Sequence, residues 1–188
     1  EIVLVDDGST DNSLEIAASF HDSRLNIISR QNGGIEAASN EGINKAKGKY
    51  IVRVDADDYL LPDYLENIIS PLADSSIHFV YSNYQVVDEK GDIQFYERLP
   101  VFSKDEIISR GDFLATGTVY VRSVVMEQGG YSEKVANCGL ENYELILNLI
   151  QAGYTGMLVP MNLFSYRIHG NNISSKRRAA IIDYGEKL

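Results

Sequence analysis

The first third of the chain alternates short apolar runs with segments in which apolar residues recur at helical spacing. The runs EIVLV and RLNIISR are rich in branched apolar residues, as is typical of strands buried on both faces of a parallel sheet. The expected strands are 1–5, 24–30 and 49–58, and the expected helices are 12–22 and 35–48. Because strands and helices alternate, the pattern predicts a right-handed α/β layer sandwich.

The rest of the chain mixes both periodicities. Two β-rich runs around DEKGD predict a hairpin, and NYELILNLIQAGY predicts an amphipathic helix. The expected elements are a helix at 61–74, the hairpin at 77–96, a strand with a short helix at 116–131, the amphipathic helix at 142–154, one or two strands at 155–170 and a final helix at 174–188. Residues 97–111 are expected to be irregular or helical. Since no repeat and no Pro/Gly linker divides the chain, we expect one domain over residues 1–188.

Composition narrows the class of protein. A formal charge of −10 and a pI near 4.7 argue against nucleic-acid binding, which needs a basic face. Cys138 is the single cysteine, which fits a reducing compartment. No apolar run approaches the length of a membrane span. The sequence opens inside a strand and without an initiator Met, so we expect that it is a fragment or lacks residues that precede Glu1.

Two acidic turns hold the candidate chemistry: DDGSTD after the first strand and DADD after the third. In an open α/β sheet, ligands bind outside the carboxyl ends of the strands, so both turns are expected at one edge. Carboxylates gathered there suit a hard cation, Mg²⁺ or Mn²⁺, that also binds substrate phosphates. The alternative is a solvated cluster of ordinary turn residues.

Four motifs together give the sequence a resemblance. EIVLVDDGSTDNS, NGGIEAASNEGINKAKGKYIVRVDADDYLLPDYLE, NYELILNLIQAGY and YRIHGNNIS occur in order from Glu1 to about Ser174. This combination resembles the family 2 glycosyltransferases. The resemblance implies a GT-A fold, an α/β three-layer sandwich with a mixed, mostly parallel central sheet. It also implies an enzyme that moves a sugar from a nucleotide-sugar, commonly a UDP-sugar, with inversion at the anomeric carbon.

The first acidic turn would face the nucleotide. Carried over from the family, Asp7 would bond the nucleobase. Asp6, beside it, is expected to be a further nucleotide-sugar-binding residue. Asn32 and Gly33 would let the backbone approach the nucleotide, although a plain glycine turn explains this loop equally well.

The second acidic turn would hold the metal and diphosphate. Asp55 would hold the ribose or the cation, and Asp57 would ligate the cation, Mn²⁺ or Mg²⁺, that bridges the diphosphate. From the YRIHG segment, His169 would reach the metal and Arg167 the phosphates. A lone His beside a strand is also commonly a hydrogen-bonded structural residue.

The catalytic base is where the sequence departs from the family. An inverting transfer needs a base for the acceptor hydroxyl, usually the Asp of a Glu-Asp pair before a helix. Here the pair reads Glu141-Asn142, and a carboxamide is no base at neutral pH. Glu141 takes the role, or the acceptor loop differs, or the transferase is weak or inactive; a further reading of Glu141 is an acid favoured at a helix N-terminus.

These assignments extend to the whole protein as expectations. Residues 1–96 would form the nucleotide-sugar-binding half, and residues 97–188 the acceptor-side half and tail. The family normally has one more strand and helix before Glu1. The expected partners are a nucleotide-sugar donor and a saccharide or lipid-linked acceptor, in bacterial surface-polysaccharide synthesis.

Location and alternatives complete the expectations. We expect a cytoplasmic protein, with a peripheral place at the inner membrane face and a homodimer as options. A basic run at 176–178 would be a solvated face, a flap or a lipid contact. The rival functions are a catalytically impaired domain that binds nucleotide or a partner, and a metal-dependent nucleotidyltransferase.

Overall fold

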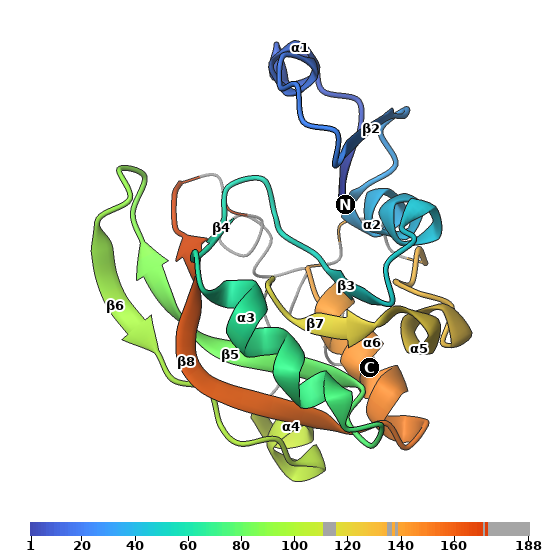
Figure 1. Ribbon diagram of the computed structural model, residues 1–188, viewed down its shortest axis with the longest axis vertical. Helices are drawn as coiled ribbons and strands as arrows, with labels where there is room; N and C mark the ends of the chain where they lie inside the picture. The colour runs from blue at the N-terminus through green and yellow to red at the C-terminus, as the bar shows by residue number, and fades with distance from the viewer. Residues whose placement is uncertain (111–115, 135–136, 138, 171, 173–188) are drawn as a thin grey trace.

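The computed structural model describes residues 1–110, 116–134, 137, 139–170 and 172 (Figure 1). The final helix expected at 174–188, the basic run at 176–178 and Cys138 lie outside the described residues.

The first half of the chain forms most of the expected elements. They are β1 (Ile2–Asp6), α1 (Ser13–Ala18), β2 (Leu25–Ser29), α2 (Ile35–Lys45), β3 (Tyr50–Val52), β4 (Tyr59–Leu60), α3 (Tyr64–Ile69), the 3₁₀ turn η1 (Ser70–Ala73), β5 (Phe79–Val87) and β6 (Ile93–Glu97). The third strand ends at Val52, earlier than expected, and the short β4 follows the second acidic turn. The alternation in VRVDAD predicts a longer strand, but β3 ends at Val52, and the second acidic turn lies between β3 and β4.

The second half adds the helices of one layer and two more strands. They are α4 (Lys104–Arg110), β7 (Val119–Val121), α5 (Arg122–Glu127), α6 (Glu141–Gln151) and β8 (Gly156–Arg167). The helical alternative for residues 97–111 is therefore confirmed in part, and the segment at 155–170 holds one long strand. The border expected at residue 96, between the nucleotide-sugar-binding half and the acceptor-side half, falls inside β6, and the division of roles between the halves stays a prediction.

The described strands form two sheets. β1 and β2 pair in parallel, while the larger sheet has the order β3-β7-β5-β8-β4, with β6 on β5. In it β5 and β8 run parallel, and the pairs β3–β7, β5–β7, β5–β6 and β4–β8 are antiparallel. The expected mixed sheet is confirmed, but a mostly parallel one is wrong for the described strands. Burial on two faces predicts a central strand, yet it does not fix the direction of its neighbours.

Two hydrophobic clusters lie on opposite faces of the larger sheet. Phe79 and Tyr81 of β5 pack with α4, α5 and α6, whereas Val80 packs with α3 and η1. Successive side chains of a strand point to opposite faces, so β5 serves both cores. Figure 1 shows α3 on one side of the sheet and α6 on the other, which gives the expected three layers.

The strand order determines where the segment with the second acidic turn lies. β3 and β4 lie at opposite edges of the larger sheet, so the segment that joins them, residues 53–58, crosses from one edge to the other. Figure 1 shows this segment arching from β3 to β4. Backbone hydrogen bonds fix its start, since the N–H of Gly117 donates to the carbonyl of Arg53 at 2.9 Å. The second acidic turn thus lies over the ends of strands from both halves of the chain.

Packing at the start of β8 gives a first prediction. A Cβ on Gly156 would overlap the ring of Phe79, its partner across the β5–β8 ladder, whereas a Cβ on Gly42 would meet Val5 Cγ2 at 3.4 Å. Gly156→Ala is expected to lower the free energy of unfolding by about 1–3 kcal/mol. Gly42→Ala, in the interior of α2, is expected to be neutral or to raise it by roughly 0.5–1 kcal/mol. Urea unfolding measures both, and equal stability of the two variants would contradict the packing.

A second prediction concerns Asp6, which ties β1 to β2. Its Oδ1 accepts from the Ser9 N–H at 3.1 Å, and its Oδ2 accepts from the Ser29 hydroxyl at 3.0 Å. Hydrogen bonding by Ser9, with a further contribution from Ser29, lowers the pKa of Asp6 although burial opposes this. A carboxyl whose pKa is lowered on folding adds stability above its unfolded pKa, near 4, and loses it as the pH falls through the folded value.

Asp6→Asn should therefore destabilise the protein most at pH 7, and the difference from wild type should shrink below about pH 4. Urea unfolding at pH 7, 5 and 3 measures it. Asp63→Asn is the control, because the Asp63 side chain makes no capping hydrogen bond to α3. A difference for Asp6→Asn that stays constant with pH would count against the ionised hydrogen bonds.

Candidate functional site

The crossing segment brings an acidic side chain to the end of β8. Asp57 Oδ2 lies 2.8 Å from His169 Nε2, although 112 residues separate them. The side chains are 38% and 23% exposed, so solvent or a ligand can reach the pair. β4 pairs antiparallel with β8, which places the turn before β4 beside the residues after Arg167. The structure thus brings together two of the three predicted metal ligands.

Asp58 and Arg167 hold this corner together. Asp58 Oδ1 accepts from the Arg167 N–H at 2.8 Å, while Asp58 Oδ2 is buried without a hydrogen bond to any described residue. Burial, followed by the charges of Asp57 and Asp55, raises the pKa of Asp58 to about 7, against the backbone hydrogen bond from Arg167. Asp58 is therefore a supporting residue whose charge varies near neutral pH.

Arg167 links three segments of backbone. Its Nε donates to the Asp57 carbonyl, and its Nη1 donates to the carbonyls of Asp88 and Glu89 at the end of β5. Its guanidinium also lies over the Tyr59 ring, 5.8 Å from the centroid. Nη2 makes no hydrogen bond within the described residues, so a phosphate contact by that group stays a prediction.

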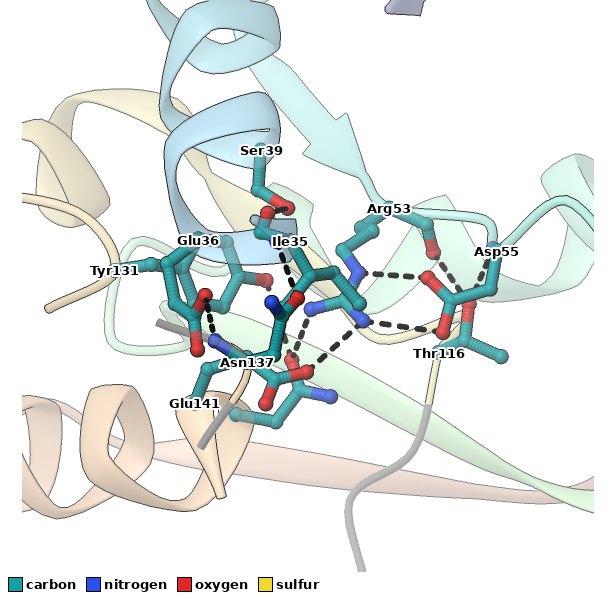
Figure 2. A network of polar contacts seen from close by, with 10 residues as sticks. Ile35, Glu36, Ser39, Arg53, Asp55, Thr116, Tyr131, Asn137 and Glu141 are labelled. Atoms are coloured by element: carbon teal, nitrogen blue, oxygen red, sulfur yellow. Dashed lines mark hydrogen bonds and ion pairs between the residues drawn. The ribbon is translucent and has the colours of Figure 1, made fainter. Parts of the chain in front are cut away.

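Asp55 pairs with Arg53, whereas Asp57 pairs with His169. Its carboxylate accepts from Arg53 Nε at 2.7 Å and from Nη2 at 3.0 Å, and its N–H donates to Thr116 Oγ1 (Figure 2). Both oxygens therefore already have a donor. Among the described residues, no three His, Cys, Asp or Glu side chains converge to hold a metal. The assignment of Asp55 to ribose or metal stays a prediction, and its contacts suit a hydroxyl partner better.

The Glu141-Asn142 pair opens α6 on the other side of Arg53. Glu141 Oε1 accepts from Arg53 Nη2 at 3.0 Å, and the residue is 6% exposed. Glu141 Oε2 is buried without a hydrogen-bond partner in the described part of the chain. Asn142 Oδ1 accepts from the Tyr131 hydroxyl at 3.2 Å and lies 3.5 Å from Arg53 Nη1. Asn142 is thus turned toward its protein neighbours.

The first acidic turn organises the loop before α2. Asp7 accepts from the N–H groups of Gly33 and Gly34, with its Oδ2 at 2.9 Å from the Gly34 nitrogen, and from Arg30 Nη1 at 3.1 Å. The structure brings Asp7, Gly33 and Asn32 together, since a Cβ on Gly8 would lie 2.9 Å from the Asn32 nitrogen. The backbone N–H groups of this loop therefore donate to the Asp7 carboxylate. Nucleotide contacts by these residues remain predictions.

Sequence reasoning missed Arg53, the residue at the centre of the polar network in Figure 2. Its guanidinium also lies 5.5 Å from the centroid of the Tyr131 ring. Burial would lower the pKa of Arg53, but contacts that include Asp55 and Glu141 hold it well above its usual range. A signal was available: a charged residue interrupts the apolar run YIVRV, on the same side of the alternation as Asp55.

Comparison with known proteins places this geometry in a family. Residues 1–126 match the family model described as glycosyl transferase family 2. A hyaluronan synthase from Pasteurella multocida is 32% identical over 183 residues, which cover 94% of this chain and 18% of the synthase. The chain therefore spans less than a fifth of that relative.

Solved structures show the same fold. S. aureus TarS in complex with UDP-GlcNAc has a TM-score of 0.73 at 20% identity, over 94% of this chain and 52% of the TarS chain. GalNAc-T7 with UDP, GalNAc and Mn²⁺ has a TM-score of 0.69 at 19% identity, over 90% of this chain and 38% of the other. The expected GT-A fold is confirmed.

Within the described part of the chain, no helix has both the length and the apolar character needed to cross a membrane. The family model covers two thirds of the sequence, including β1, the loop before α2 and the second acidic turn. This chain belongs to glycosyl transferase family 2.

Proposed function

We propose that the chain is the GT-A domain of a metal-dependent, inverting glycosyltransferase. The observation that carries the proposal is the partly exposed Asp57–His169 pair, which lies at the end of the crossing segment in a chain of this family. TarS and GalNAc-T7 have the same fold and were solved with UDP-GlcNAc and with UDP, GalNAc and Mn²⁺. We take a UDP-sugar as the donor here.

The donor would bind along the two acidic turns. Asp7 and the loop of Asn32 and Gly33 would contact the nucleobase, with Asp6 holding the turn through Ser29. Asp55 would accept a hydrogen bond from a ribose hydroxyl, because each of its oxygens keeps a lone pair beyond the one that Arg53 uses. Arg167 Nη2, which makes no hydrogen bond to a described residue, would donate to a phosphate oxygen.

Asp57 and His169 would hold the cation, Mn²⁺ or Mg²⁺. Their side chains suit such a cation, because a carboxylate oxygen and an imidazole nitrogen, both metal-ligating atoms, lie 2.8 Å apart at a partly exposed corner. Such cations use few protein ligands and complete their coordination with phosphates and water. When bound, the cation would offset the charge that gathers on the leaving diphosphate.

Glu141 is the candidate base. As the acceptor oxygen forms its bond to the anomeric carbon, the bond from that carbon to the diphosphate oxygen breaks, and the electron pair leaves with the UDP. The acceptor proton would pass to Glu141, whose Oε2 has no hydrogen-bond partner among the described residues. Arg53 Nη2 donates to the other oxygen, Oε1, and so leaves Oε2 for the acceptor hydroxyl.

The remaining assignments concern the whole protein. We propose a single GT-A domain, with a saccharide or lipid-linked acceptor on the side of residues 97–188. The reaction would serve surface-polysaccharide synthesis, at the cytoplasmic face of the membrane. The acidic composition gives no support to a nucleic-acid partner.

Metal dependence gives the first prediction for this function. UDP is expected to bind with Mn²⁺ or Mg²⁺ and to lose most of its affinity in EDTA, because the cation joins the diphosphate to Asp57. Asp57→Ala should remove the difference between the two conditions, whereas Asp74→Ala, an exposed turn residue after η1, should keep it. Isothermal titration calorimetry measures both, and equal UDP affinity with and without EDTA in the wild type would overturn the metal role.

The Glu141-Asn142 pair gives the second. If Glu141 is the base, Glu141→Gln should lower the rate of transfer by on the order of a hundred- to ten-thousand-fold, and Asn142→Asp should change it little. The measurement is UDP release from UDP-GlcNAc or UDP-glucose with Mn²⁺ and added acceptor. Full activity of Glu141→Gln would show that the base lies elsewhere.

Asn142 also favours a second candidate function, a catalytically impaired transferase that binds nucleotide. In that case Asn142→Asp should raise transfer by a factor of the same order, because it supplies the missing carboxylate. UDP binding would be preserved in both cases, so the turnover of the Asn142→Asp variant decides between them.

A further inference from the structure

Arg53 is the hydrogen-bonding centre between the donor-side turn and α6. It lies just after β3, and its side chain is 15% exposed. Nε and Nη2 each donate to one oxygen of Asp55. Nη2 also donates to Oε1 of Glu141, which is 88 residues away in the sequence. Figure 2 shows these side chains converging on the guanidinium from different elements. One cation thus serves two carboxylates.

The geometry is specific to arginine. A guanidinium presents its N–H groups as a planar fork that can hold one carboxylate with two bonds and still donate to another, and an ammonium group cannot reproduce this. The face of the fork lies over the Tyr131 ring, and Tyr131 in turn donates to Asn142. The first turn of α6 is therefore fixed to the segment after β3 by one side chain and its aromatic support.

The hydrogen bonds of Arg53 fix the orientation of the Glu141 carboxylate and leave its second oxygen available. Glu141 Oε1 is held by Arg53, and Oε2 is buried without a partner among the described residues. A buried acceptor without a donor is costly, so such an oxygen points to a ligand hydroxyl or water that completes it. Because Arg53 fixes the other oxygen, it sets where Oε2 lies relative to Asp55.

We propose that Arg53 is a positioning residue that sets the register between the donor-binding turn and the base at the start of α6. The inference rests on the proposed function, in which Asp55 contacts the donor and Glu141 receives the acceptor proton. Arg53 itself would touch neither substrate: the pairing with Asp55 fixes its guanidinium, and Arg53 would act on kcat through Glu141.

The test compares Arg53→Lys with Arg122→Lys in the intact protein. Arg122 is the matched control because its guanidinium also ties two segments, by donation to the carbonyls of Ile43 and Asn44 in the last turn of α2, the opposite end of that helix from the loop that Asp7 bonds. With UDP-GlcNAc or UDP-glucose and Mn²⁺, Arg53→Lys is expected to lower kcat for UDP release on the order of a hundredfold, as misplacement of a reacting group does. The donor KM should change far less, and Arg122→Lys should keep the wild-type kcat.

Two further measurements separate positioning from general loss of structure. Hydrogen exchange of the amides at the start of α6 should become faster in Arg53→Lys and stay at the wild-type rate in Arg122→Lys, while Mn²⁺ affinity by titration is retained in both. In a Glu141→Gln background, Arg53→Lys should cause no further loss of kcat, because Arg53 acts through Glu141. Equal kcat and equal exchange in the two lysine variants would overturn the inference.

The outcomes also separate this inference from the proposed function. A wild-type protein that neither binds UDP nor releases it would overturn the proposed function and, with it, a catalytic role for Arg53. An active wild type whose Arg53→Lys variant keeps its kcat would overturn the inference alone. If Arg53→Lys does not fold, Arg53→Met combined with Glu141→Gln removes both ends of the ion pair; a kcat equal to that of Glu141→Gln alone then supports the inference, and a lower one overturns it.

Discussion

The parallel pairing of β5 with β8 is the contact on which the rest of the structure depends. It runs from Phe79 and Gly156 at one end to Val87 and Arg167 at the other, and β5 is buried along most of its length. Helices cover both faces of this ladder, so its side chains fill both cores. Because β4 adds to the far side of β8, the chain must cross the sheet between β3 and β4, and the crossing carries the acidic turn to the end of the ladder.

Internal donors make this gathering of carboxylates tolerable. Asp55 and Glu141 share Arg53, Asp57 faces His169, and Asp58 takes a backbone N–H from Arg167. A cost remains at Asp58, where burial, followed by the charges of Asp57 and Asp55, raises the pKa to about 7. The turn therefore combines carboxylates with permanent protein partners and one pair, Asp57 with His169, that is open enough to take a ligand. This division is what separates supporting residues from candidate binding residues.

Much of the fold and part of the site could be predicted from the sequence. Apolar periodicity located β1, α2, the β5–β6 hairpin and α6, since burial demands apolar residues at the spacing of each element. The motifs indicated the family, which the family model confirms. Strand direction was harder: an apolar run such as FVY in β5 is compatible with a parallel or an antiparallel neighbour, so the predicted excess of parallel pairing was wrong.

The residue types at the turns follow directly from the sequence: carboxylates after β1 and β3, a Glu-Asn pair at the start of α6, and an Arg and a His at the end of the last described strand. The partners of these residues depend on the three-dimensional fold. Asp57 meets His169 because β4 pairs with β8, and Asp55 meets Glu141 through Arg53 because the crossing segment runs past the start of α6. Ion pairs and hydrogen bonds act over a few ångströms in space, and no local pattern encodes which distant segments the packing of a sheet will bring that close.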